Sequence, residues 1–101
     1  MTGEYRIVTL CGSVRFAEAF REAQKRLTLE ECIVLSPVFF EGSGEMPDKQ
    51  TRAMLADMHR RKIDLSDEIF VVNPGGYIGE TTLLEIEHAR RAGKKVRFLE
   101  E

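Results

Sequence analysis

The sequence has little of several residue types that mark particular classes of protein. It contains no tryptophan, three prolines and two cysteines in 101 residues, and its 15 lysines and arginines nearly balance its 17 aspartates and glutamates. A net charge of −2 argues against a protein that grips the backbone of a nucleic-acid polymer, because such proteins are usually basic. No apolar run approaches the length of a membrane-spanning helix, so we expect no membrane partner.

The two cysteines, Cys11 and Cys32, stand far apart, each within an apolar segment. Residues 1–4 are polar and lack the pattern of a secretory signal, which favours a cytoplasmic location. We therefore expect both cysteines to be small buried side chains in a reducing compartment, rather than a disulfide or a nucleophile. No spacing of cysteine and histidine is typical of a zinc site, and we expect neither a metal nor a cofactor.

Four apolar segments rich in β-branched residues alternate with three helical patterns, without an internal repeat or a linker. Strands that are apolar on both faces and alternate with helices indicate a parallel sheet covered by helices on each side. We predict a single domain, residues 1–101, with an α/β three-layer Rossmann-like (flavodoxin-like) fold and a sheet of four to five strands. The predicted strands are 6–11, 32–36, 68–73 and 95–99.

Helical spacing of apolar residues follows each of the first three predicted strands. We expect Ser13 to cap the first helix and Asp48 to open the second, after a loop over 38–47. Gly93 is expected to end the third helix. The predicted apolar stripe of the second helix consists of Met54, Leu55, Met58 and Leu65.

One carboxylate of the third helix, Glu85, faces inward on a helical wheel. At about 100° per residue, Ala92 lies about 20° and Ala89 about 40° from Glu85, whereas the other charged side chains face away. An unpaired buried carboxylate costs free energy, so it needs a function or a structural partner. The helix alone leaves two interpretations open: a functional carboxylate, or a capping box in which Thr82 caps the helix and Glu85 bonds back to it.

Two loops at the carboxyl ends of strands contain the candidate binding residues. Gly12, Ser13 and Arg15 follow the first strand at a helix N-terminus, where amides, a hydroxyl and a guanidinium favour an anion. The alternative is a tight turn with a capping serine and a solvated arginine. In the second loop, 73–79, glycines let the backbone approach a ligand and Tyr77 offers a ring and a hydroxyl. If the strand order is 2-1-3-4, the loops meet at the crevice where open α/β sheets bind ligands.

Several segments together match the pattern of a known family. They are residues 10–15, Asp67 before the third strand, Gly79, the helix with Glu85, Ile86 and Ala89, and residues 93–94. On these residues the chain resembles the nucleoside 2-deoxyribosyltransferase-like family, which includes the 2'-deoxynucleoside 5'-phosphate N-hydrolases. The matching segments make up nearly half of the chain, and residues 28–58 match only in their pattern.

The resemblance implies that Glu85 is the nucleophile that attacks the anomeric carbon of the sugar. It implies that Gly12, Ser13 and Arg15 hold a 5'-phosphate. The implied reaction cleaves the N-glycosidic bond and passes the sugar to water or to another base, and we expect hydrolysis. His59 stands where the family often has an aspartate near the base, so it is a second catalytic candidate, as an acid. The alternative for His59 is a surface or a satisfied core histidine.

The remaining expected substrate-binding residues are Asn73, Tyr77 and Gly79. Gly79 replaces a serine or aspartate of the family, and Thr9 replaces a tyrosine. These departures favour the alternative function, a non-catalytic nucleotide-binding or sensing domain on the same fold. A structural subunit in which Glu85 is only a cap is a third interpretation. The expected partner is a small nucleotide or nucleoside, and small size and the resemblance predict a homodimer or a higher homo-oligomer.

Overall fold

The computed structural model describes residues 4–38 and 47–101, so most of the loop expected over 38–47 lies outside the described residues. Two one-turn 3₁₀ helices, η1 (Val14–Phe16) and η2 (Pro74–Gly76), follow the first and third strands. The strands and α-helices are β1 (Arg6–Gly12), α1 (Ala17–Leu29), β2 (Cys32–Leu35), α2 (Lys49–Leu65), β3 (Glu68–Val72), α3 (Glu80–Arg91) and β4 (Lys95–Phe98).

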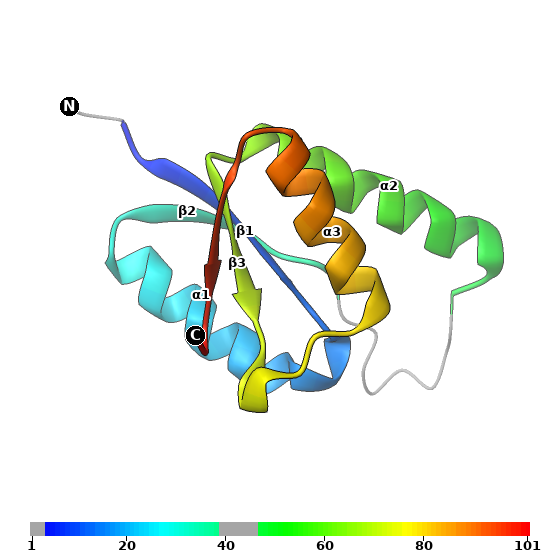
Figure 1. Ribbon diagram of the computed structural model, residues 1–101, viewed down its shortest axis with the longest axis horizontal. Helices are drawn as coiled ribbons and strands as arrows, with labels where there is room; N and C mark the ends of the chain where they lie inside the picture. The colour runs from blue at the N-terminus through cyan, green and yellow to red at the C-terminus, as the bar shows by residue number, and fades with distance from the viewer. Residues whose placement is uncertain (1–3, 39–46) are drawn as a thin grey trace.

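The four strands form one parallel sheet in the order β2-β1-β3-β4. Its register places Val8 of β1 opposite Val34 of β2, and Leu10 opposite Phe70 of β3. Helix α1 lies on one side of the sheet, and α2 and α3 lie together on the other (Figure 1). The predicted α/β Rossmann-like fold is therefore confirmed, with four strands.

Both faces of the sheet are buried because alternate strand residues point to opposite sides. The core on the α1 side consists of Val8, Leu10, Phe20, Ala23, Leu27, Cys32, Phe70 and Val72. The core under α2 and α3 consists of Cys11, Ile63, Ile69, Val71, Ile86 and Ala89. Strands buried on both faces explain why the sequence has continuous apolar segments rather than alternation.

The inner face of α2 differs from the predicted stripe. His59 and Ile63 are buried and Leu55 is partly buried, whereas Met54, Met58 and Leu65 are exposed. The buried positions are spaced by four residues, so each exposed methionine, one position earlier, lies about 100° around the helix. The prediction was right for Leu55 and wrong for the other three residues, because the inner face follows the spacing of Leu55, His59 and Ile63.

A buried carboxylate ties three strands together at the amino end of the sheet. Glu68, at the start of β3, is 2% exposed. Its Oε1 lies 3.1 Å from Arg6 of β1, and its Oε2 lies 3.0 Å from Arg97 of β4. Because both oxygens accept charge-assisted hydrogen bonds, this buried charge is compensated.

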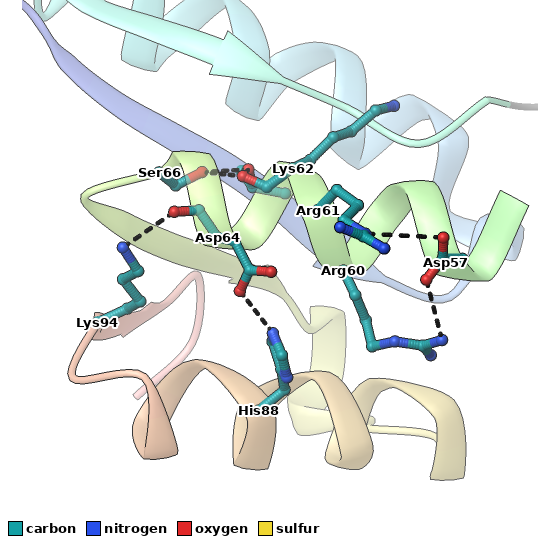
Figure 2. A network of polar contacts seen from close by, with 9 residues as sticks. Asp57, Arg60, Arg61, Lys62, Asp64, Ser66, His88 and Lys94 are labelled. Atoms are coloured by element: carbon teal, nitrogen blue, oxygen red, sulfur yellow. Dashed lines mark hydrogen bonds and ion pairs between the residues drawn. The ribbon is translucent and has the colours of Figure 1, made fainter.

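Polar contacts join α2 to α3 and to the segment that follows α3, near the amino end of the sheet (Figure 2). The Asp64 carboxylate lies 2.7 Å from Nε2 of His88, and the Asp64 backbone oxygen accepts a hydrogen bond from Lys94 at 3.1 Å. Arg60 and Arg61 contact Asp57 along the exposed part of α2. In the described part of the chain, no helix is both long enough and apolar enough to cross a membrane.

Candidate functional site

The loops after β1 and β3 meet α2 and α3 around a cleft of about 600 Å³. It lies at the carboxyl end of the strands, as the strand order 2-1-3-4 predicts. Six predicted site residues line it: Gly12, Ser13, His59, Tyr77, Gly79 and Glu85. Its other lining residues are Val14, Pro37, Leu55, Ala56, Glu80, Thr81 and Thr82.

Gly12 is required by the close approach of β1 to β3 at the base of the cleft. Its φ of +152° is unfavourable for other residues. A Cβ at this position would lie 2.7 Å from the carbonyl oxygen of Val72 and 3.1 Å from the ring of Phe20. The glycine therefore lets the first loop turn directly over the sheet edge.

Ser13 and Arg15 occupy different places beside the cleft. Ser13 caps η1, and its hydroxyl accepts a hydrogen bond from the Arg15 backbone amide at 3.4 Å. The α-helix itself begins later, at Ala17. The guanidinium of Arg15 lies 4.6 Å from the centre of the Tyr77 ring, a cation–π contact. Because Tyr77 lines the cleft and Arg15 does not, this positive charge lies at the rim.

Asn73 is buried and has no place in the cleft lining. Its amide nitrogen donates to the Glu100 backbone oxygen at 3.0 Å, and its Oδ1 accepts from the Glu100 backbone amide at 2.9 Å. These two bonds hold the chain after β4 against the end of β3. The structure therefore gives Asn73 a structural contact and places it apart from the other candidates.

Glu85 faces inward from α3, with 17% of its side chain exposed. The helix begins at Glu80 with Gly79 as its N-cap, so Thr82 is the third helical residue and Glu85 lies beyond the first turn. The capping-box interpretation, and a capping role for Thr81 or Thr82, are therefore wrong. The local pattern matched, but the helix starts where the preceding glycine loop ends.

His59 lies between Glu85 and a cysteine of the first strand. Its Nε2 is 3.5 Å from Oε1 of Glu85 and 3.5 Å from Sγ of Cys11. Among the described residues, Oε1 of Glu85 and Nδ1 of His59 are buried without a hydrogen-bond partner. Buried polar atoms without partners are uncommon and costly in folded proteins. A ligand that bonds to these unpaired atoms would therefore stabilise the folded protein.

Cys11 is the member of this cluster that sequence reasoning missed as a site residue. Burial raises the pKa of its thiol well above the ordinary value of 9.0, and the charge of Glu85 raises it further. A protonated, buried thiol is a poor nucleophile, as the sequence led us to expect. Only the three-dimensional contact with His59 distinguishes Cys11 from an ordinary buried cysteine.

Thr9, where the family often has a tyrosine, lies beneath α2. Its hydroxyl contacts the hydroxyl of Ser66 and the backbone oxygen of Lys62, so it is a packing residue. Gly79 lines the cleft, and a Cβ at this position would lie 3.4 Å from the hydroxyl of Tyr77, an ordinary contact distance. The two departures thus have separate structural consequences, one in the core and one in the cleft.

The charge of the cleft is negative. Its lining includes Glu80 and Glu85, and within residues 4–38 and 47–101 it includes no lysine or arginine. The guanidinium of Arg15 lies at the rim, against the Tyr77 ring. A ligand that enters the cleft therefore meets the Glu85 carboxylate inside and a cation at the rim.

A scan against models of protein families and a search of curated protein sequences found no match.

Proposed function

We propose that this chain cleaves the N-glycosidic bond of a nucleoside 5'-monophosphate, as a nucleotide N-glycosidase or a related deoxyribosyltransferase-like enzyme with Glu85 as the nucleophile. The observation that carries the proposal is the position of Glu85. Its carboxylate is held inward at a cleft of about 600 Å³, although a buried oxygen without a hydrogen-bond partner destabilises the fold. A cleft of this volume is within the usual range for small-molecule sites.

The residues that line the cleft support a nucleotide with its phosphate at the rim and its sugar deeper inside. Ser13 lines the cleft and the guanidinium of Arg15 lies at its rim, and a hydroxyl and a guanidinium suit a phosphate. The ring of Tyr77 offers a surface for stacking. A phosphate at the rim leaves the sugar deeper in the cleft, where the Glu85 carboxylate can reach the anomeric carbon.

The chemistry follows from these positions. A carboxylate oxygen of Glu85 forms a bond to the anomeric carbon while the bond from that carbon to the base nitrogen breaks. The base leaves with a proton, and His59, which lines the cleft beside Glu85, is our candidate donor. Water then attacks the anomeric carbon, gives one proton back to His59, and releases the sugar phosphate and the Glu85 carboxylate. Two displacements at one carbon give overall retention.

The test measures free base released from a panel of ribo- and deoxynucleoside monophosphates by chromatography, with a metal chelator present. We expect release by the native chain and a loss of more than about 100-fold in Glu85→Gln, because the amide is a poor nucleophile. Glu87→Gln is the matched control. Glu87 lies on the same helix but is exposed and paired with Arg91 at 3.3 Å, so release should be unchanged.

The same assay separates the alternative function. Nucleotide binding without release of base, in the native chain as in Glu85→Gln, would favour a binding or sensing domain. A second comparison concerns the phosphate: Ser13→Ala should raise KM for the monophosphate more than for the free nucleoside. Equal effects on the two substrates would remove the phosphate from the proposal.

A further inference from the structure

Three side chains that commonly bind metal ions meet at one point beneath the cleft. Cys11 comes from β1, His59 from α2 and Glu85 from α3, and their ligand atoms all lie within 4.8 Å of one another. The three residues are far apart in sequence, so the strand order and the packing of α2 against α3 bring them together. A thiol, an imidazole and a carboxylate form a donor set that suits zinc.

Two of the three ligand separations match those around a shared ion, and the third, between Sγ of Cys11 and the Glu85 carboxylate, is within 4.8 Å. A tetrahedral zinc with bonds of about 2.3 Å to sulfur and about 2.05 Å to nitrogen and oxygen separates sulfur from nitrogen by about 3.6 Å, and nitrogen from oxygen by about 3.4 Å. Here Sγ of Cys11 lies 3.5 Å from Nε2 of His59, and Nε2 lies 3.5 Å from Oε1 of Glu85.

A direct histidine–carboxylate hydrogen bond looks different in the same protein. His88 and Asp64 approach to 2.7 Å across the two helices. The corresponding separation of His59 and Glu85 is 3.5 Å, and Oε1 of Glu85 has no hydrogen-bond partner among the described residues. The shorter pair is partly exposed and satisfied, whereas the longer pair is buried and has an unused acceptor that faces its neighbours.

The charge of the surroundings favours a cation. Glu80 and Glu85 both line the cleft, and no lysine or arginine of the described residues does. A divalent ion bound by these three side chains has the carboxylate of Glu85 and the sulfur of Cys11 among its ligands, and a coordinated thiol loses its proton. Coordination forms a metal–sulfur bond and releases the thiol proton to solvent.

We propose that Cys11, His59 and Glu85 bind one Zn²⁺, with a fourth position that opens to the cleft. Three protein ligands and an open position are the arrangement of a reactive zinc site rather than a closed structural one. The consequence for the reaction rests on the proposed function: bound zinc occupies the Glu85 carboxylate and inhibits cleavage of the glycosidic bond.

The binding test uses the full chain in a phosphine reductant, with Zn²⁺ in calorimetry and Co²⁺ as an optical probe. We expect about one ion per chain and a cobalt–thiolate absorption band. Cys11→Ser should abolish the band, and His59→Gln and Glu85→Gln should each weaken zinc binding by at least about 10-fold. Cys32→Ser and His88→Gln are the matched controls, a buried cysteine and a carboxylate-paired histidine outside the cluster, and should bind as the native chain does.

The result that overturns the site is a native chain without the band, which does not depend on any variant folding. A band that persists in Cys11→Ser and disappears in Cys32→Ser overturns it equally.

Base release measured with chelator and with zinc separates the two proposals. Zinc binding without base release under chelator removes the glycosidase and keeps the metal site, whereas release without zinc binding does the reverse. If release of the base requires zinc, the proposal that zinc inhibits the reaction is wrong.

Discussion

Replacement of Glu85 by methionine should stabilise the fold while it abolishes the proposed activity. Methionine has a similar length and helix propensity, so the change mainly removes a charge. Oε1 of Glu85 is buried without a hydrogen-bond partner among the described residues. Residues that a protein retains at a cost in stability are commonly functional ones.

The magnitude follows from two opposing terms. A buried polar atom without a partner costs about 1–3 kcal/mol. The contact with Nε2 of His59 at 3.5 Å returns part of this, and we take about 0.5–1 kcal/mol for it, the lower part of the range for a hydrogen bond. The expected net gain on Glu85→Met is about 1 kcal/mol. With a urea m-value of about 1–3 kcal/mol per molar, the unfolding midpoint should rise by about 0.5 M.

The measurement is urea unfolding followed by circular dichroism, with chelator present so that no metal contributes. Glu87→Met on the same helix is the control, because Glu87 is exposed and paired with Arg91. Its midpoint should change little, since exposed pairs contribute about 0–1 kcal/mol. A fall of about 0.5 M or more for Glu85→Met, with Glu87→Met unchanged, would mean that the Glu85 carboxylate stabilises the fold, and the reasoning would fail.

Three further predictions test the surroundings of the cleft. Gly12→Ala should cost about 2–5 kcal/mol in unfolding free energy, because a Cβ meets the Val72 carbonyl oxygen at 2.7 Å; a smaller loss would refute the tight turn. Glu68→Ala should cost about 1–3 kcal/mol, since two partly exposed arginines lose their buried partner, and an unchanged urea midpoint would contradict this. The raised pKa of Cys11 keeps its thiol protonated below the ordinary value of 9.0, so at pH 8 iodoacetamide should modify it only after unfolding; rapid labelling of the native chain at Cys11, mapped by mass spectrometry against Cys32, would refute its burial.

The fold was predictable because its signals are local. Each strand is a continuous apolar segment, and each helix has its own start and stop residues, so the α/β class follows from alternation alone. The prediction of which face of each helix packs on the sheet was less secure. In α2 the exposed Met54 and Met58 compete with a true inner face that contains His59. A periodic count of apolar residues gives no weight to a buried polar side chain such as His59.

The candidate site was predictable in part. Glu85 was placed inward because its neighbours one turn away are small and apolar, and Gly12 and Ser13 because a short turn ends the first strand. The capping box was wrong because helix α3 starts earlier than the local motif indicates. The contact of Cys11 with His59 joins residues 48 positions apart, and no spacing rule along the sequence reaches that far.

The two proposals make different demands on one carboxylate, and the charges of the cleft decide how they interact. The guanidinium of Arg15 lies at the rim, against Tyr77, whereas the Glu85 carboxylate faces inward from α3. An anion is therefore favoured outside and a cation inside. A nucleotide matches this distribution of charge only if its phosphate lies near Ser13 and its sugar lies above Glu85. Zinc on Glu85 then excludes the sugar but leaves the phosphate position free, so inhibition by zinc should compete with whole nucleotides and not with inorganic phosphate.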